Sequence, residues 1–207
     1  MPKITKTTNK KVDQGKQTHQ TLVKTARSLF SGKGYEKTST EEVVKEANVT
    51  RGALYHHFKG KRELFKAVFD DVHVDIADGI IKGTRKEAGL WNRLLKGTYT
   101  FLDLCLEPGT QRIVLIDGPA VLGWQEWREI DNQRSMIYLR NILRDLIVEQ
   151  GINDLPLEPT VHLVSGATNE MALWIAQAED PKTAHSHARL TLKLLFEKLL
   201  LTKGGRP

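Results

Sequence analysis

The chain has 207 residues, of which 40% are hydrophobic, and its formal net charge is +6 at pH 7. That length and composition allow one or two modest domains with an ample apolar core. A single cysteine, Cys105, excludes an internal disulfide framework and fits a reducing compartment. No apolar run reaches the roughly 18–20 residues of a membrane span, and residues 1–17 lack the apolar segment of a secretory signal. We therefore expect a cytoplasmic protein without a membrane partner.

The net positive charge of the chain lies entirely in its N-terminal third. Residues 1–66 hold 15 Lys and Arg against 6 Asp and Glu, a net of +9, whereas residues 67–207 hold 16 against 19, a net of −3. This asymmetry implies an anionic partner for the N-terminal part alone. A solvated basic surface would show the same charge, so the motif within this part must decide between the two.

Residues 1–15 are polar and basic, which is typical of a flexible arm. Such an arm is either inert or placed along DNA phosphates or in a minor groove. A first helix is expected from about Lys16 to Ser31, and the glycines of residues 32–34 would end it. Its buried face comprises Leu22, Val23, Ala26, Leu29 and Phe30.

Residues 40–58 have the pattern of two short helices separated by a tight turn. Thr38 and Ser39 are each followed three residues later by a glutamate, which is the capping-box spacing that opens a helix. Asn48 lies at the turn, and Asn tolerates the left-handed backbone conformation that a turn requires. The stretch therefore predicts a helix-turn-helix unit.

The second of these helices, Arg51 to Phe58, has the character of a recognition helix. Thr50 precedes it, and its hydroxyl can accept hydrogen bonds from the free amides of the first turn. Leu54 and Phe58 lie on one side, while the other side is polar and carries a glycine near its start. A short capped helix of this kind suits insertion into a DNA major groove.

The spacing of residues from Gly34 to Leu64 resembles the DNA-binding region of the tetracycline-repressor (TetR) family. One departure is Asn48, where the family often has glycine, and both residues suit the turn. The second half of the chain agrees with the family in length, in its all-helical pattern and in the segment 117–124. The resemblance is carried by Gly34, Tyr35, Thr38, Val43, Ala47, Val49, Gly52, Leu54, Tyr55, His57, Phe58, Lys61 and Leu64, of which His57 and Phe58 are packing positions.

Residue type and place suggest how this unit would contact DNA. The first residues of a recognition helix face base edges, so Arg51 is expected to read guanine through hydrogen bonds to O6 and N7. Gly52 would allow close backbone approach, and the remaining residues would contact phosphate or sugar. Lys61 starts a further helix, whose N-terminus favours anions. The predicted DNA-binding residues are Thr40, Thr50, Arg51, Gly52, Tyr55, His56, Lys59 and Lys61.

The remainder of the chain is expected to be helical. Residues 111–116 could be a strand by periodicity alone, but their surroundings favour a helix. Helices are expected at about 61–82, 91–105, 111–116, 123–149, 160–178 and 183–201, with breaks at Pro108-Gly109 and at Asp117-Gly118-Pro119, and a loop at 152–159.

The last two of these helices are apolar almost all round. A helix with two apolar faces must bury both, either in the core of a monomer or against a second copy of the chain. The family resemblance favours the second copy, because these proteins typically pair through their last two long helices. A two-fold dimer would present two recognition helices and would require a palindromic operator.

All four tryptophans lie in the C-terminal part, where large aromatic residues either form the core or line an apolar cavity. The family resemblance implies a cavity for a small-molecule effector of unknown identity. By the same resemblance, the effector would favour a conformer whose recognition helices no longer match the operator. The residues expected to line the cavity are Trp91, Tyr99, Trp124, Trp127, Tyr138, Met171 and Trp174.

No catalytic or metal site is expected. Cys105 lies on an apolar helix face with no basic neighbour, which indicates an inert core thiol rather than a nucleophile. A metal would be one reading of the acidic cluster around His73, but a solvated helix face explains the cluster more simply. The acids are Asp70, Asp71, Asp75 and Asp78.

The sequence thus predicts an all-α protein of about nine helices that uses no cofactor. It would consist of an arm (1–15), a three-helix helix-turn-helix domain (16–66) and a helical effector-binding and dimerisation domain (67–207). The leading functional hypothesis is a repressor released from a palindromic operator by an effector. An effector-independent or activating DNA-binding regulator is the alternative, and an enzyme with an accessory DNA-binding domain is a distant third.

Overall fold

The structure is a computed structural model that describes residues 5–152 and 154–201. It contains no strand in these ranges, which confirms the all-α prediction. In chain order the elements are α1 (Thr5–Lys33), α2 (Thr40–Glu46), α3 (Arg51–His57), α4 (Lys61–Thr84), α5 (Leu90–Cys105), α6 (Pro108–Gln111), the π-helix η1 (Arg112–Asp117), α7 (Gly118–Leu122), α8 (Trp124–Gln150), α9 (Leu157–Gln177) and α10 (Pro181–Leu200).

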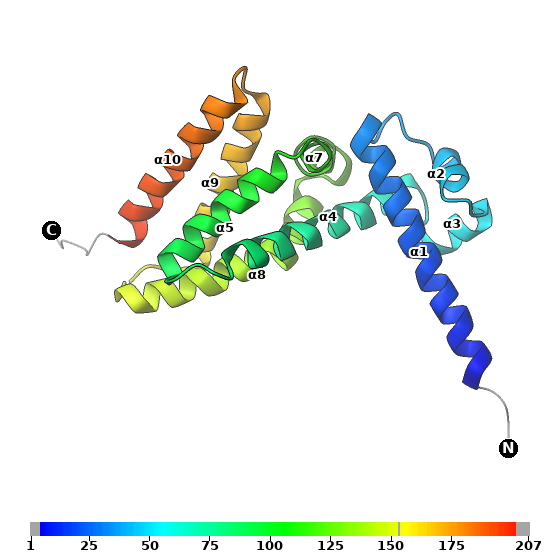
Figure 1. The fold of residues 1–207 in the computed structure, drawn as a ribbon, viewed down its shortest axis with the longest axis horizontal. Coiled ribbons are helices and arrows are strands. Elements are labelled where there is room, and N and C mark those ends of the chain that lie inside the picture. Colours follow the sequence, from blue (N-terminus) through cyan, green and yellow to red (C-terminus); the bar gives the residue numbers. More distant parts are fainter. Residues whose placement is uncertain (1–4, 153, 202–207) are drawn as a thin grey trace.

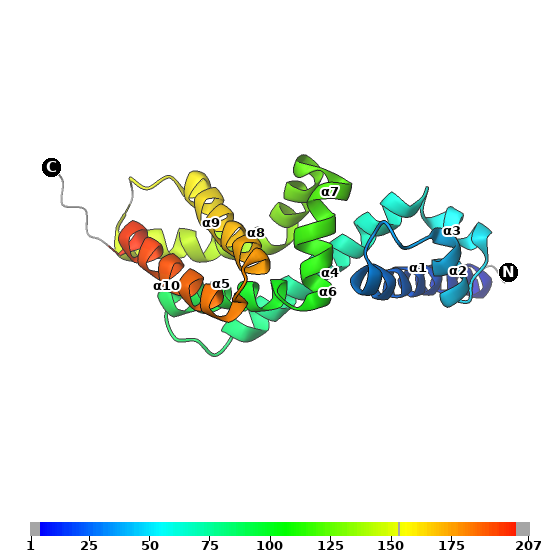
Figure 2. The ribbon, with the colours of Figure 1, turned by 90° about the horizontal axis from the view of Figure 1, so that it is seen from above.

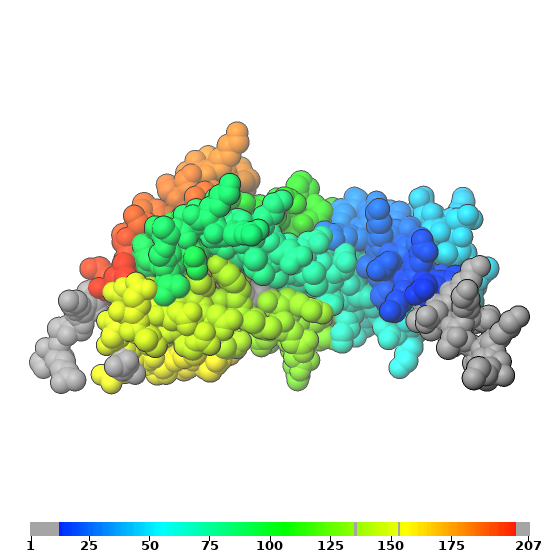
Figure 3. Space-filling model, turned by 60° about the horizontal axis from the view of Figure 1, so that its bottom comes forward, coloured from blue at the N-terminus to red at the C-terminus, as the bar shows by residue number. Residues whose placement is uncertain are grey.

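The molecule is elongated, with α1, α2 and α3 at one end and α9 and α10 towards the other (Figure 1). Helix α4 runs between the two ends and packs against α1, α5 and α8. The view from above shows the same division (Figure 2). In the space-filling view, the blue and cyan N-terminal helices form one end of the surface and the red end of α10 lies near the opposite end (Figure 3). Within the described ranges, no helix is both long and apolar enough to cross a membrane.

The first two short helices form as their caps predict. Ser39 is the N-cap of α2, and its hydroxyl accepts from the backbone N–H of Glu42 at 3.1 Å. Thr38 has a different role from the predicted capping: its side chain is buried and donates to the carbonyl of Gly34 at 2.9 Å. Asn48 has a φ of 52°, so the turn does use the left-handed conformation.

The start of α1 differs from the expectation. The helix begins at Thr5 rather than near Lys16, so residues 5–15 continue α1 instead of forming an irregular arm. Residues 1–4 lie outside the described residues. Residues 5–15 contain no proline, and their three lysines are good helix formers, so the helix can continue through them despite the threonines and Gly15. The low apolar content of residues 5–15 predicted a flexible arm, but it does not prevent them from extending a helix whose later residues pack on the core.

The segment 108–122 also differs from the expectation. The break predicted at Pro108-Gly109 is present directly before Pro108, at residues 106 and 107 between α5 and α6. The break predicted at Asp117-Gly118-Pro119 is absent, because α6, η1 and α7 follow one another without interruption. In a π-helix the backbone N–H of residue 119 would donate to the carbonyl of Val114, five residues earlier. Pro119 has no N–H, so it cannot make this hydrogen bond. Instead the indole Nε1–H of Trp127 donates to that carbonyl at 3.0 Å. A side chain from α8 therefore satisfies the group that the proline leaves open.

The last two helices begin earlier than predicted. Helix α9 starts at Leu157, which places Pro159 in its first turn, where no intrahelical N–H donor is needed. Helix α10 starts at Pro181, and Asp180 caps it by accepting from the N–H groups of Lys182 and Thr183. The two helices pack on each other, and α9 packs on α8.

Candidate nucleic-acid interface and effector cavity

The outer face of α3 is exposed and carries Arg51, Gly52, Tyr55 and His56. Arg51 lies in the first turn with its side chain 70% exposed. Its guanidinium is 3.8 Å from the carboxylate of Glu41 and 5.5 Å from the ring centroid of Tyr55. A Cβ on Gly52 would meet nothing closer than the Thr50 hydroxyl at 3.9 Å. This glycine is therefore not required by internal packing.

The opposite face of α3 fixes the helix on the domain. Leu54 is fully buried and Phe58 is 3% exposed. His57 packs with His19, and burial together with His19 and His56 lowers the pKa of His57. A packing role for His57 agrees with the expectation from the sequence.

The predicted phosphate-binding residues differ in how free they are. Thr50 is the N-cap of α3, and its hydroxyl accepts from the N–H of Ala53 at 3.1 Å. Thr40 donates to the carboxylate of Glu41 at 3.2 Å. The ammonium of Lys61 donates to the backbone carbonyl of Tyr35 at 3.0 Å and lies 4.1 Å from the centre of the Tyr35 ring. His56 and Lys59 are exposed.

Ion pairs and hydrogen bonds join this unit to the C-terminal helices. The backbone N–H of Tyr35 donates to Asp117 at 2.9 Å. Arg62 donates to the carbonyls of residues 121 and 122 and pairs with Glu126 at 2.7 Å. Lys66 also pairs with Glu126, and these two cations lower the pKa of that carboxyl. The N-terminal part of α4 is thus held to α7 and the start of α8.

Three acidic residues of α4, Asp70, Asp71 and Asp75, form further ion pairs. Arg134 of α8 donates two hydrogen bonds to Asp70, both of 2.8 Å. Arg27 of α1 pairs with Asp71 at 2.8 Å and with Asp75 at 2.5 Å. Across the described ranges, no group of three or more His, Cys, Asp or Glu residues could hold a metal ion.

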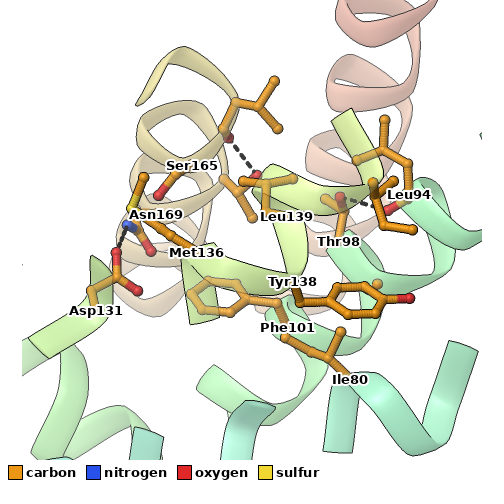
Figure 4. Close-up of a pocket in the computed structure, with 14 residues that line it drawn as sticks. Ile80, Leu94, Thr98, Phe101, Asp131, Met136, Tyr138, Leu139, Ser165 and Asn169 are labelled. Atoms are coloured by element: carbon orange, nitrogen blue, oxygen red, sulfur yellow. Dashed lines mark hydrogen bonds between the residues drawn. The ribbon is translucent and has the colours of Figure 1, made fainter. Parts of the chain in front are cut away.

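A cavity of about 60 Å³ lies between α4, α5, α8 and α9. Figure 4 shows residues from these helices converging on it. Its walls are mainly apolar, and its polar groups lie on α5, α8 and α9. The lining residues are Ile80, Leu94, Gly97, Thr98, Phe101, Asp131, Met136, Tyr138, Leu139, Ile142, Val164, Ser165, Thr168 and Asn169.

Of the seven residues predicted for an effector cavity, only Tyr138 lines this one. Its hydroxyl donates to Thr84 at 2.7 Å. Trp91 is half-buried on α5, and Tyr99 donates to the carbonyl of Arg189 on α10 at 3.3 Å. Met171 is half-buried on α9.

The three remaining tryptophans also lie elsewhere. Trp124 is 65% exposed and stacks on the buried Trp127, with ring centroids 5.4 Å apart. Trp174 is 44% exposed on α9. An aromatic residue at helical spacing can face the core, the solvent or another helix, so the sequence could not assign these residues to one cavity.

The sequence reading missed the polar residues of the cavity. Asp131 is 2% exposed and Asn169 is 8% exposed, and the amide of Asn169 lies 3.5 Å from the Asp131 carboxylate. Burial raises the pKa of Asp131, while His73, Arg128 and Asn169 act in the opposite direction. Polar residues on otherwise apolar helix faces were the signal that could have found them.

The fold and the exposed recognition helix define a class of protein, namely a helix-turn-helix DNA-binding protein with an all-α C-terminal domain. Residues 22–68 match the family described as "Bacterial regulatory proteins, tetR family". Residues 91–199, more than half of the chain, match the one described as "Tetracyclin repressor-like, C-terminal domain". The chain therefore belongs to the TetR family. It is a DNA-binding transcriptional regulator, not an enzyme.

Individual relatives agree with this assignment. The Transposon Tn10 TetC protein of Escherichia coli is 30% identical over 158 residues, which are 76% of this chain and 80% of that protein. The probable acrEF/envCD operon repressor of E. coli is 42% identical over 52 residues, 25% of this chain and 24% of that protein. The crystal structure of a TetR-family regulator from Pectobacterium atrosepticum is similar with a TM-score of 0.79 and 31% identity, and the match covers 92% of this chain and 97% of that one.

Proposed function

We propose that the protein is a repressor that binds a palindromic operator as a dimer and leaves it when a small molecule enters the cavity. The observation that carries the DNA-binding part is the outer face of α3. This face presents Arg51, Gly52 and Tyr55 to solvent on a helix that is capped and anchored from behind. A rigid helix with an exposed Arg at its start has the geometry required to read a guanine edge.

The dimer is proposed to form through α9 and α10. These helices leave an apolar face that the rest of the chain does not cover, and apolar surface of this extent favours association with a second copy. On α9, Leu163 and Trp174 are eleven residues apart, about three helical turns, and so share a face. The exposed apolar residues that we assign to this face are Leu163 and Trp174 on α9, Leu190 and Leu194 on α10, and Leu201 directly after α10.

The proposed release mechanism uses α4. Ile80 near the end of this helix lines the cavity, and Arg62 and Lys66 near its start hold the ion pairs to Glu126. A ligand that binds better to a conformer in which α4 is displaced would shift the population towards it. Displacement of α4 would change the distance between the two recognition helices, and the dimer would no longer match its half-sites.

The experiment is selection of binding sequences from random duplex DNA by the full chain, followed by a reporter assay of the selected site. We expect a palindrome with half-sites about one helical turn apart, or a multiple of that distance, and lower reporter expression when the protein is present. A selected sequence without two-fold symmetry would contradict the dimer. Reporter expression that rises with the protein would replace repression with activation.

A further inference from the structure

The Asp131 carboxylate lines an otherwise mainly apolar cavity, and its hydrogen-bond donors on Asn169 and Arg128 lie at long distances. The Asn169 amide lies 3.5 Å from this carboxylate and the Arg128 guanidinium 3.9 Å from it, both longer than an ordinary hydrogen bond, and the buried His73 is a further neighbour. The residue is 2% exposed, so the surrounding solvent does not solvate it freely. Burying a carboxylate without close donors is costly, and a ligand that brings a donor recovers that cost.

Arg128 does not fill this role, because the two tryptophans hold its side chain. Its guanidinium lies 4.9 Å from the Trp124 ring centroid and 5.7 Å from that of Trp127. One of its terminal nitrogens, Nη1, is buried without a hydrogen-bond partner. At 3.9 Å from Asp131, this guanidinium is too far away to donate an ordinary hydrogen bond to the carboxylate, and of the two residues only Asp131 lines the cavity.

The other residues of the cavity wall restrict the polarity, charge and size of the ligand. Ile80, Phe101, Met136 and Ile142 supply apolar surface, and Thr98 and Thr168 already donate to carbonyls of their own helices. None of the lining residues is Lys, Arg or His. An anionic ligand would thus find no cation in the wall and would face the Asp131 carboxylate. A volume of about 60 Å³ restricts the ligand to a small molecule.

We propose that the ligand of this cavity is a small, largely apolar molecule that donates a hydrogen bond to Asp131 from an amine or a hydroxyl, and that molecules carrying a carboxylate are excluded. The effector role of this ligand rests on the proposed function, whereas its binding to the cavity does not. Figure 4 shows the position that it would occupy, with Asp131 and Asn169 at one side of the cavity and Phe101 and Tyr138 nearby.

Three small probes, ethylamine, ethanol and acetate, test the proposal by isothermal titration of the full chain, because a cavity of about 60 Å³ is too small for an aromatic ring. Each carries one short alkyl group, and they differ in the polar group. We expect ethylamine and ethanol to bind, and acetate to bind about tenfold more weakly or not at all. The stronger of the first two tells whether the donor is cationic or neutral. Acetate binding as tightly as the others, or binding by none of them, overturns the proposal.

The variant Asp131→Asn keeps the shape of the side chain and removes its charge. It should weaken ethylamine binding about tenfold or more. The matched control is Asp145→Asn on the same helix, where Asp145 is exposed and pairs with its neighbour Arg144. Equal effects of the two substitutions contradict the role of Asp131. If Asp131→Asn does not fold, the three probes on the unsubstituted chain decide alone.

Operator binding in the presence of the probes separates this inference from the proposed function. Probes that fail to bind a protein that still binds its operator overturn the inference and leave DNA binding intact. Probes that bind as expected without releasing the operator leave the chemistry of the cavity intact and overturn effector release.

Discussion

Arg51 is the residue whose setting bears most directly on DNA recognition. Thr50 fixes the start of α3, and Leu54 fixes its inner face, so the Arg51 side chain is offered on a rigid support. Its contacts with Glu41 and Tyr55 are long and exposed, and such contacts are worth little in water. DNA can therefore replace them at small cost.

The substitution Arg51→Ala should cost about 1–3 kcal/mol of operator-binding free energy and relax the preference at one base pair. Fluorescence anisotropy with the operator and its single-base-pair variants measures both effects. Arg85→Ala, which removes the same charge at the far end of α4, serves as the control and should leave binding unchanged. Equal weakening on every DNA sequence would assign Arg51 to phosphate instead of a base.

At the scale of elements, the contact of η1 and α7 with α4 and α8 depends on the absence of a side chain at Gly118. A Cβ at this position would lie 2.7 Å from the Phe69 ring, 2.8 Å from the carbonyl of Ile113 and 3.1 Å from Trp127. A backbone carbonyl cannot move aside as the end of a flexible side chain can.

We expect Gly118→Ala to lower the free energy of unfolding by about 1–3 kcal/mol through overpacking. Chemical denaturation followed by circular dichroism measures this change. Gly15→Ala is the matched control, because a Cβ there would meet nothing within 4 Å in the middle of α1. It should be neutral or stabilising by about 0.5–1 kcal/mol through helix propensity. A stable Gly118→Ala protein would mean that the π-helix region rearranges easily.

The pairing of α4 with α8 at Glu126 makes stability depend on pH. Lys66 and Arg62 lower the pKa of Glu126 below its ordinary value of 4.5. The folded state then binds the proton less tightly than the unfolded state, so the pair contributes stability above pH 4.5 that is lost as the pH falls through the folded-state pKa.

The substitution Glu126→Gln should lower the melting temperature at pH 7 and make the acid-side loss of stability below pH 4.5 less steep. Thermal melts from pH 7 to pH 3 provide the measurement. Glu149→Gln, an exposed position on the same helix, is expected to leave the curve unchanged. The same pH profile in the Glu126→Gln protein and the unsubstituted chain would show that the pair adds nothing.

At the scale of the whole molecule, the exposed apolar residues of α9 and α10 form the surface through which the proposed dimer would bring two recognition helices together. Leu194 is 51% exposed on α10, one helical turn from Leu190, which is 56% exposed. A charge introduced here would remain solvated in a monomer but would have to be buried in the proposed dimer.

Leu194→Glu is therefore expected to give a folded monomer with much weaker operator binding. Sedimentation velocity measures the mass, and circular dichroism confirms the helix content. Ile81→Glu introduces the same charge at a residue of α4 that is 50% exposed, and it should leave the dimer intact. A Leu194→Glu protein that is still dimeric would place the interface on another face.

The sequence by itself determined the helix-turn-helix unit. Ser39, Asn48 and Thr50 act on backbone groups within three residues of themselves, and Leu54 and Phe58 share a face by helical spacing alone. Such local interactions do not depend on the rest of the chain, so their pattern also identified the family. The element types in the C-terminal part followed from periodicity in the same way.

Only the tertiary structure decided where the cavity lies and which residues line it. Helical spacing gives the face of a residue but not its partner, so it could not tell that Trp127 contacts the Val114 carbonyl while Phe101 faces the cavity. The continuity of the segment 108–122 was likewise hidden, because the donor that replaces the missing proline N–H comes from another helix. The sequence shows that residue 131 is an aspartate, but not that it is buried. Its lack of a close hydrogen-bond donor results from the packing of α4, α5, α8 and α9 around the cavity.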